Sequence, residues 1–246
     1  MPRFSSVLRF VLAVSAIASS AQPVRAQESK AFHAVVFMTG ATMMSVDELN
    51  GRLGDARFAG LSNDGISYGL SGYYAYGRAL LGADVSHTAY GEEGLSNGRS
   101  DDLNATQMLA TVSYAVLATG RVNLFPTMGI GSGRFDVTLR DRAGATASSP
   151  TASSPTVPTF DEVAQNPGQS TMLSGRHLLY SVGGGADFLI VRRASDKAGV
   201  VFGLRGGYLI APNRTAWTSN GRPVITGPDA SAGGPFLRIV VGVGGR

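Results

Sequence analysis

The sequence contains no cysteine, little charge and no long apolar run beyond its first residues. The absence of Cys from the 246 residues excludes disulfide frameworks, Cys-ligated zinc, iron–sulfur clusters and thiol nucleophiles. Charged residues make up 15% of the chain, well below the ~25% of an average globular domain. Beyond residue 26, no window approaches the ~18 uninterrupted apolar residues of a transmembrane helix. The mature chain is therefore predicted to have no such helix.

Apolar residues and glycine are abundant instead. Apolar residues make up 43% of the chain. The 33 glycines among 246 residues are about 13% of the chain, nearly twice the usual ~7%. Because this much apolar surface must be buried or placed in lipid, the chain is not a charged disordered tail. The glycines follow no three-residue period, which excludes a collagen-like helix.

The N-terminus has the pattern of a secretory signal peptide. Arg3 and Arg9 precede an apolar stretch at residues 10–18, and Val24 and Ala26 place small side chains before a cleavage site. About nine apolar residues are too few for a membrane anchor, which needs ~20. We therefore expect this segment to be cleaved after export.

Cleavage of residues 1–26 changes the charge balance. The full chain has 21 Lys and Arg against 17 Asp and Glu. The segment contains three arginines and no acid, so the mature chain, residues 27–246, has a net charge of about +1. This nearly neutral charge gives no support for a nucleic-acid partner.

A two-residue alternation of apolar and small polar residues runs through the mature chain. Between Ile66 and Tyr76 the even positions are aromatic or apolar, and the odd positions are mostly small or polar. Such alternation is typical of half-buried β-strands. It recurs in seven other runs, at residues 31–39, 81–89, 107–116, 122–133, 178–188, 202–210 and 237–243. The sequence therefore predicts eight strands.

The connections between these runs alternate in length. Long ones, at residues 40–63, 91–102, 140–172 and 212–231, alternate with short ones at residues 77–78, 119–120 and 191–198. Transmembrane β-barrels have this asymmetry, with short periplasmic turns and longer outer loops. The runs also match the ~9–11 residues that a tilted strand needs to cross a bilayer. We therefore predict an all-β fold, an eight-stranded antiparallel transmembrane β-barrel.

Two of the long connections have a distinctive composition. In the first, Ser45 and Glu48 have capping-box spacing, and apolar residues at helical spacing predict a short helix over residues 46–57. This helix either caps the barrel mouth or enters the lumen. In the third, the repeat TASSPTASSP at residues 146–155 predicts a mobile Ser/Thr/Pro-rich loop over about residues 140–172. That loop is either a duplicated spacer or a surface for interaction.

The polar faces of the predicted strands carry four charged residues that we expect to form a network in the lumen: Asp84, Asp187, Arg205 and Arg238. In a narrow interior of low dielectric, each charge needs a partner of opposite sign. We expect Asp187 to pair with Arg205. Near a predicted break in the alternation, Arg134 and Asp136 belong to the same polar face. Such pairs either lock the barrel shut or form a gate for small solutes.

The three histidines give no metal site. His33, His87 and His177 lie on different predicted strands without paired spacing, whereas a metal needs converging ligands. His87 lies on an apolar face, and this position resembles that of the lipid-facing His in barrel enzymes that trim lipid A, where a His and a Ser activate one another. Its neighbour Ser86 points to the other face, so this set is incomplete. We therefore expect no catalytic residue, no metal and no cofactor.

Aromatic residues near the strand ends are expected to form girdles at the membrane interfaces. They are Tyr74, Tyr76, Tyr90, Tyr114 and Tyr208, with His87 in the same band. The single tryptophan, Trp217, lies in the last long connection beside Asn213 and Arg214. It is either an exposed contact for lipopolysaccharide or another ligand, or part of the packing of the loop.

The whole mature chain resembles the small eight-stranded outer-membrane β-barrels of the OmpA, OmpX and OmpW types. The resemblance rests on the alternating strands and on the stretch NLFPTMGIGSG at residues 123–133, where a proline precedes alternating glycines. These barrels usually end in an aromatic residue that the insertion machinery reads. This chain ends in Val-Gly-Gly-Arg, and we expect Phe236 with the apolar stripe after it to be a displaced or divergent form of this signal. The resemblance implies a location in the bacterial outer membrane, contact with its lipid and lipopolysaccharide, and insertion by that machinery.

We therefore expect a monomeric outer-membrane barrel with a non-enzymatic structural or interaction role in the envelope, and at most limited passage of small solutes. Three alternatives stay open. A channel for hydrophobic compounds requires a lateral opening or an apolar lumen, and the polar faces argue against an apolar lumen. A lipid-modifying barrel enzyme requires a complete His/Ser/acid set on one lipid-facing patch. A soluble, lipocalin-like periplasmic carrier of an apolar ligand requires the apolar face of the strands to point inward.

Overall fold

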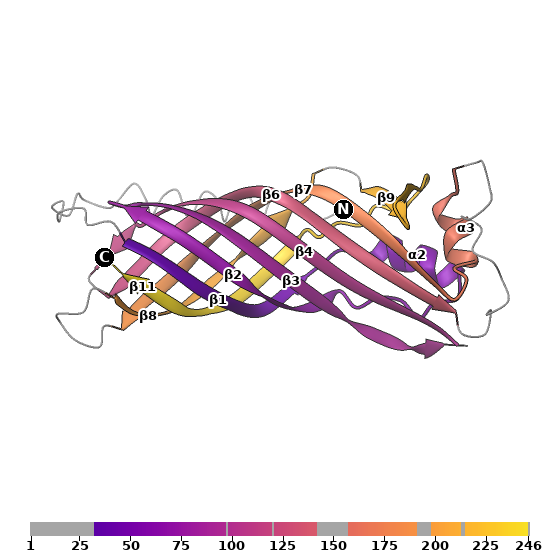
Figure 1. The fold of residues 1–246 in the computed structure, drawn as a ribbon, viewed down its shortest axis with the longest axis horizontal. Helices are drawn as coiled ribbons and strands as arrows, with labels where there is room; N and C mark the ends of the chain where they lie inside the picture. Colours follow the sequence, from indigo (N-terminus) through magenta and orange to yellow (C-terminus); the bar gives the residue numbers. More distant parts are fainter. Residues whose placement is uncertain are drawn as a thin grey trace.

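Long antiparallel strands wrap around a common axis in the computed structural model (Figure 1). The structure describes residues 32–96, 98–119, 121–141, 157–190, 198–212 and 215–245. The predicted signal peptide and the tandem repeat at residues 146–155 lie outside these residues.

Eight long strands form the wall of a barrel. They are β1 (Phe32–Met43), β2 (Asp64–Tyr76), β3 (Ala79–Ser96), β4 (Arg99–Tyr114), β6 (Val122–Asp141), β7 (Ser170–Ile190), β8 (Ala198–Ile210) and β11 (Gly234–Gly245). Three short strands attach to them, β5 (Leu117–Ala118), β9 (Ala216–Ser219) and β10 (Arg222–Pro223). The long strands pair in the order β1-β2-β3-β4-β6-β7-β8-β11, and β11 pairs back with β1. The predicted eight-stranded antiparallel barrel is therefore confirmed.

Side chains alternate between the lumen and the outer surface, as predicted. On β2, Ile66, Leu70 and Tyr74 are 70%, 59% and 50% exposed. Ser67 and Ser71, which have the opposite parity, are buried. The apolar face therefore points outward, and this contradicts the lipocalin-like alternative.

The outward apolar residues form a belt as tall as the core of a bilayer. Along β8, the side chains of alternate residues from Val200 to Ile210 are exposed and apolar, apart from Gly206. Ten residue steps of about 3.3 Å, inclined by about 40°, span about 25 Å. That height matches the ~25 Å apolar band of outer-membrane barrels. A closed barrel with such a belt spans a membrane, and the expected outer-membrane location is confirmed.

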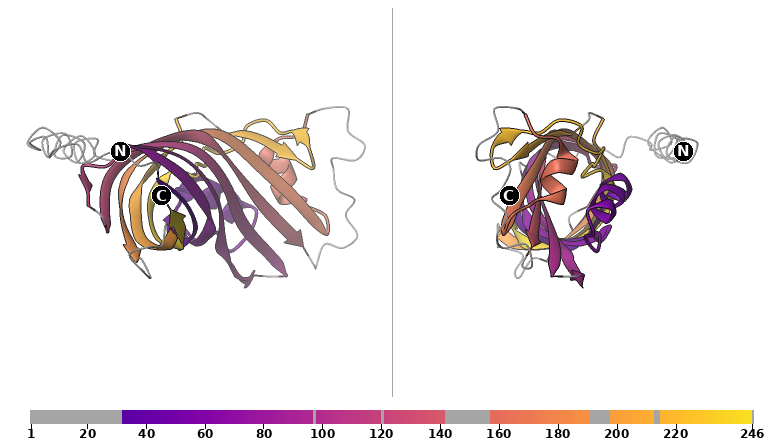
Figure 2. Two further views of the ribbon diagram at one scale, coloured as in Figure 1. Left: turned by 60° about the vertical axis from the view of Figure 1, so that its left-hand side comes forward. Right: turned by 90° about the vertical axis from the view of Figure 1, so that its right-hand side faces the viewer.

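The two ends of the barrel differ. Phe32, Gly245 and the tight turn at residues 77–78 lie at one end, which the short turns identify as periplasmic. The longer connections and both helices lie at the other, the outer end (Figures 1 and 2).

Four strands continue past the belt at the outer end. β3, β4, β6 and β7 have 18, 16, 20 and 21 residues, against 12 in β1 and in β11. Since β3 ends at Ser96 and β4 begins at Arg99, the prediction of a long loop at residues 91–102 is wrong. It failed because strands outside the membrane stay paired after their lipid-facing pattern has ended.

Where these strands leave the belt, the outward face becomes polar and the inward face becomes apolar. On β6, the outward face changes from apolar to polar residues after Ile130. The inward face of the same strand becomes apolar and fully buried, at Phe135, Val137 and Leu139. The strand therefore passes from lipid into water without any change of register.

An apolar cluster, which we call the outer seal, fills the outer end. It consists of Met44, Val46, Leu49, Leu53, Ala56, Phe58, Leu61, Tyr90, Leu103, Ala105, Phe135, Val137, Leu139, Phe160, Val163, Ala164, Leu173, Trp217, Val224, Ala230 and Ala232. Two helices contribute to it, α2 (Asp47–Asp55) and α3 (Phe160–Gln165), and both are seen at the barrel mouth in Figure 2. Neither of these described helices has the length and apolarity to cross a membrane.

The helix predicted in the first long connection is confirmed, but its predicted cap is wrong. The N-cap residue of α2 is Val46, and no side chain caps it. Ser45 instead pairs its backbone with Ser231. Leu49 and Leu53 are buried in the outer seal, so the helix closes the barrel mouth.

A second helix, α3, lies within the predicted Ser/Thr/Pro-rich loop. Its N-terminus has a capping box, in which the Glu162 amide donates to Thr159 Oγ1 (3.2 Å) and the Thr159 amide donates to Glu162 Oε2 (2.8 Å). Arg52 Nη1 on α2 lies 2.6 Å from Asp161 Oδ2 on α3 and links the two helices. Together they form one folded surface at the outer end.

Candidate functional site

The middle of the lumen holds a polar layer. Toward the periplasmic end lies an apolar cluster that we call the inner seal: Phe32, Ala34, Val36, Met38, Tyr73, Leu80, Ala115, Phe125, Val201 and Val240. Along β3, the inward residues run from Leu80 in the inner seal through Asp84 to Tyr90 in the outer seal. The polar layer therefore lies between two apolar clusters.

Tyr73 and Asp187 form the first contact across this layer. The Tyr73 hydroxyl on β2 donates a hydrogen bond of 2.7 Å to Asp187 Oδ2 on β7. The same carboxylate oxygen lies 3.5 Å from Arg205 Nη2. The structure thus brings together Asp187 and Arg205, the pair that the sequence predicted.

Arg205 is the centre of the polar layer. Its Nη1 donates to Ser71 Oγ at 2.9 Å and lies 3.9 Å from Asp84 Oδ1. Its guanidinium also lies over the rings of Tyr73 and Phe125, at 5.3 and 5.8 Å from their centroids. One cation therefore interacts with two carboxylates and two aromatic faces, which offsets part of the cost of burying it.

Arg238 binds an amide where an acid was expected. Its Nη2 donates to Gln107 Oε1 at 3.3 Å, and Ser86 Oγ donates to the same oxygen at 3.4 Å. The guanidinium lies 4.9 Å from the ring centroid of Phe236. Three of the four predicted charges thus form one ion-paired group, and Arg238 lies in a neighbouring hydrogen-bonded group.

These contacts join opposite walls of the barrel. In the circular order of the eight long strands, β2 and β7 are four places apart, as are β3 and β8, and β4 and β11. Each such pair of strands is joined by one contact, and we call these three contacts the cross-lumen ties: Tyr73–Asp187, Asp84–Arg205 and Gln107–Arg238. The lumen is therefore bridged by polar side chains at its centre.

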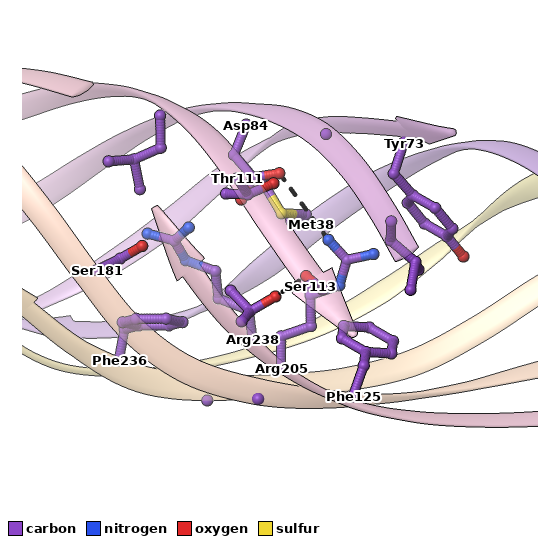
Figure 3. Close-up of a pocket in the computed structure, with 16 residues that line it drawn as sticks. Met38, Tyr73, Asp84, Thr111, Ser113, Phe125, Ser181, Arg205, Phe236 and Arg238 are labelled. Atoms are coloured by element: carbon purple, nitrogen blue, oxygen red, sulfur yellow. Dashed lines mark hydrogen bonds and ion pairs between the residues drawn. The ribbon is translucent and has the colours of Figure 1, made fainter. Parts of the chain in front are cut away.

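The side chains of the polar layer leave little free volume. A cavity of about 40 Å³ lies between Asp84, Arg205, Arg238 and Ser181 (Figure 3). A water molecule in the liquid occupies ~30 Å³. This cavity holds one or two water molecules and is too small for a solute.

Aromatic side chains close the outer seal above this layer. The ring centroid of Trp217 lies 5.1 Å from that of Phe135 and 5.0 Å from that of Phe160, both in edge-to-face geometry. Its Nε1 donates to the Pro228 carbonyl oxygen at 2.9 Å. Trp217 is therefore part of the packing of the loop, the second of the two roles considered for it.

Arg134 and Asp136 lie on the outer surface, so their predicted place on the lumenal face is wrong. β6 keeps its register through this region, which leaves both residues with outward parity. Arg134 Nη2 lies 2.9 Å from Asp136 Oδ1 and donates to Ser174 Oγ at 3.1 Å. Ser174 Oγ in turn donates to Asp136 Oδ1 at 2.5 Å. The prediction failed because it interpreted a reversal of polarity as a break in register.

The three histidines lie apart in the structure. His177 is buried inside, 5.6 Å from the ring of Phe135. His87 faces outward with its Nδ1 3.1 Å from Thr106 Oγ1 and its ring 5.3 Å from that of Tyr68. In the part of the chain that the structure describes, no three His, Asp or Glu side chains come together as a metal site.

Four of the five predicted girdle tyrosines face outward. Tyr74, Tyr76 and Tyr114 lie toward the periplasmic end and Tyr208 toward the outer end of its strand. Tyr90 is buried in the outer seal at 1% exposure, so its predicted place in a girdle is wrong. It lies beyond the belt, where the inward positions are the apolar ones.

Three lumenal partners were not predicted from the sequence: Ser71, Tyr73 and Gln107. All three have the parity of the small polar face. A large side chain among small neighbours on that face, such as Tyr73 between Ser71 and Ala75, is the signal that would have found Tyr73. Such a side chain is long enough to reach the opposite wall of a narrow barrel.

No protein-family model and no curated protein sequence matches this chain. Among solved structures, it is similar to Neisserial surface protein A (12% identity, TM-score 0.43), covering 88% of this chain and 98% of the other. It is also similar to Ail, the attachment invasion locus protein of Yersinia pestis, in complex with the heparin analogue sucrose octasulfate (12% identity, TM-score 0.45, the same coverage). A major outer membrane protein from Thermus thermophilus is a third (12% identity, TM-score 0.41, covering 87% and 98%).

Proposed function

We propose that this protein is a sealed outer-membrane barrel with a non-enzymatic structural or interaction role, exerted through its lipid-facing wall and its outer surface. The observation that supports this most is the set of three cross-lumen ties between two apolar seals. A channel or gate needs a continuous polar path, and the seals interrupt that path at both ends. The lumenal network therefore acts as a lock, and small solutes do not pass.

The protein acts as a monomer. Every long strand is paired on both sides, and β11 closes on β1 from Phe236 opposite Thr42 to Gly245 opposite His33. Such closure needs no strand from a second copy. The insertion machinery acts on β11, which carries the apolar stripe after Phe236.

Planar-bilayer recording tests the sealed lumen. The folded wild-type protein is expected to give no current steps above the bare bilayer, while an open porin recorded under the same conditions gives them. The double variant Arg205→Ala/Arg238→Ala removes the cations of two ties. It is the control that shows what is recorded when these two side chains no longer fill the lumen. Regular steps from the wild-type protein would overturn the proposal.

One observation favours a second function, lipid modification. His87 lies 3.1 Å from the hydroxyl of Thr106 on the outward face, which is the start of a nucleophile–base pair. Among the described residues no carboxylate contacts His87, so the set stays incomplete. We expect the lipid A of cells that make the wild-type protein to match that of cells making His87→Ala. An altered lipid A that depends on His87 would establish the enzyme.

A further inference from the structure

Two arginines lie side by side on the outer surface of the barrel. Arg134 on β6 and Arg176 on β7 are direct partners in the pairing register. Both side chains have outward parity, and both line the same surface groove. Like charges directly opposite on neighbouring strands repel each other. Their juxtaposition therefore favours a negatively charged group between them.

The protein itself supplies only part of that negative charge. Arg134 is paired with Asp136 at 2.9 Å. Within the described ranges, Arg176 makes no ion pair and no side-chain hydrogen bond. Two guanidinium groups thus face one carboxylate, and the guanidinium of Arg176 stays available for an external anion.

The groove beside the two arginines has both polar and apolar walls. Its volume is about 760 Å³, and it lies over β4, β6 and β7. Near the arginines, Thr106 and Ser132 contribute hydroxyl groups, and on the periplasmic side Met108 and Leu178 contribute apolar side chains. A ligand that fits it carries an anion at one end and hydrocarbon at the other.

The arginines lie at the outer edge of the apolar belt. On β7, Arg176 is the first outward residue beyond the lipid-facing Leu178, and on β6 Arg134 is the second beyond Ile130. On β4, the outward face likewise changes from Met108 to Thr106. This level is where the headgroups of the outer leaflet meet the hydrocarbon core.

We infer that Arg134 and Arg176 bind a phosphate group in the headgroup of an outer-leaflet glycolipid whose acyl chains lie against Met108 and Leu178. A guanidinium matches the geometry of phosphate oxygens and forms short, charge-assisted hydrogen bonds with them. The hydroxyl groups of Thr106 and Ser132 are placed to bind the sugar beside the phosphate. The inference rests on the membrane placement in the proposed function and is independent of whether the lumen is sealed.

The test measures binding of a defined lipid to the refolded full-length mature chain. Native mass spectrometry in detergent counts bound bis-phosphorylated lipid A, and the same lipid without its phosphates is the comparison. The site variant is Arg134→Gln/Arg176→Gln. The matched control is Arg78→Gln/Arg121→Gln, which removes two cations from the periplasmic turns. Each protein must first show the heat-dependent gel shift of a folded barrel, which separates failure of the barrel from failure of the site.

The wild-type protein and the control variant are expected to bind the phosphorylated lipid about tenfold more tightly than the dephosphorylated lipid. The site variant is expected to lose this preference. Arg176→Gln alone breaks no ion pair or side-chain hydrogen bond of the described structure, and it replaces the double variant if that variant does not fold. We expect Arg176→Gln to lose most of the preference for the phosphorylated lipid. Equal binding of both lipids by the wild-type protein, or full preference in the site variants, would overturn the inference. Displacement of the lipid by millimolar inorganic phosphate would also overturn it, because the site would then belong to free phosphate.

Discussion

Tyr73 and Asp187 face each other across the full width of the barrel, joined by a 2.7 Å hydrogen bond between β2 and β7. Neighbouring strands are already held together by backbone hydrogen bonds. A contact between opposite walls has a different effect, because it fixes the cross-section of the lumen. Since Asp187 is 3% exposed, the loss of either partner leaves a polar group buried.

Removal of the Tyr73 hydroxyl is expected to destabilise the barrel. Tyr73→Phe leaves the ring in the inner seal but removes the shorter of the two hydrogen bonds to Oδ2 of the buried Asp187 carboxylate, so that only the 3.5 Å contact with Arg205 remains. A hydrogen bond to a charged group contributes about 1.5–3 kcal/mol, and we expect the free energy of unfolding in urea to fall by that amount. The matched control is Tyr74→Phe, because Tyr74 points to lipid and is half exposed. Equal stability of the two variants would show that the tie contributes nothing.

The outer seal is expected to open locally when an anchor of α2 is removed. Leu49 is fully buried in the seal, and Leu→Ala changes at such sites cost about 2–5 kcal/mol. Trp217, the single tryptophan, lies in the same cluster, so its fluorescence reports on the seal alone. In Leu49→Ala we expect the Trp217 emission to shift to longer wavelength at one urea concentration, and the heat-dependent gel shift to be lost only at a higher urea concentration.

Glu48→Ala is the control for this experiment, because Glu48 is the exposed neighbour of Leu49 on the same helix. It should leave the fluorescence transition unchanged. If Leu49→Ala moves the fluorescence and gel transitions together, the seal and the barrel form a single cooperative unit, contrary to this account.

Close approach of β4 and β6 makes Gly131 sensitive to substitution. A Cβ added there would overlap the Met108 carbonyl oxygen and come within 2.8 Å of Leu109 Cα. The strands must therefore move apart, and we expect Gly131→Ala to lower the free energy of unfolding by about 1–3 kcal/mol. At Gly72, the nearest atom to an added Cβ is the Ala34 carbonyl oxygen at 3.9 Å, so Gly72→Ala should be tolerated. Urea titration of both variants in the same detergent checks the difference.

The wall of the barrel within the membrane was predictable because lipid imposes a strict two-residue pattern. Ile66, Leu70 and Tyr74 must be apolar, and their neighbours must fill a narrow interior. That requirement fixed the parity of Asp187 and Arg205, and hence their position in the lumen.

Beyond the membrane the same two-residue pattern gave wrong predictions. There the solvent on the outer face is water, so Phe135 turns inward and Arg134 outward without any break in register. Contacts between distant segments, such as Gln107 with Arg238, depend on which strands are opposite in the closed barrel. A linear pattern does not contain that information, and the same holds for the packing of α3 over the mouth.

The reactivity of one introduced thiol tests the sealed lumen most directly. Because the chain has no cysteine, Ser181→Cys places a single thiol beside the lumenal cavity, at a position that is 3% exposed. Met172→Cys, at an outward position of β7 that is 40% exposed, is the reference. In the folded protein, we expect a water-soluble maleimide to modify Cys at 181 at least about a hundredfold more slowly than Cys at 172, since reaction must wait for local opening. After heat unfolding the two rates should be equal, whereas equal rates in the folded barrel would show that the lumen is open to solutes.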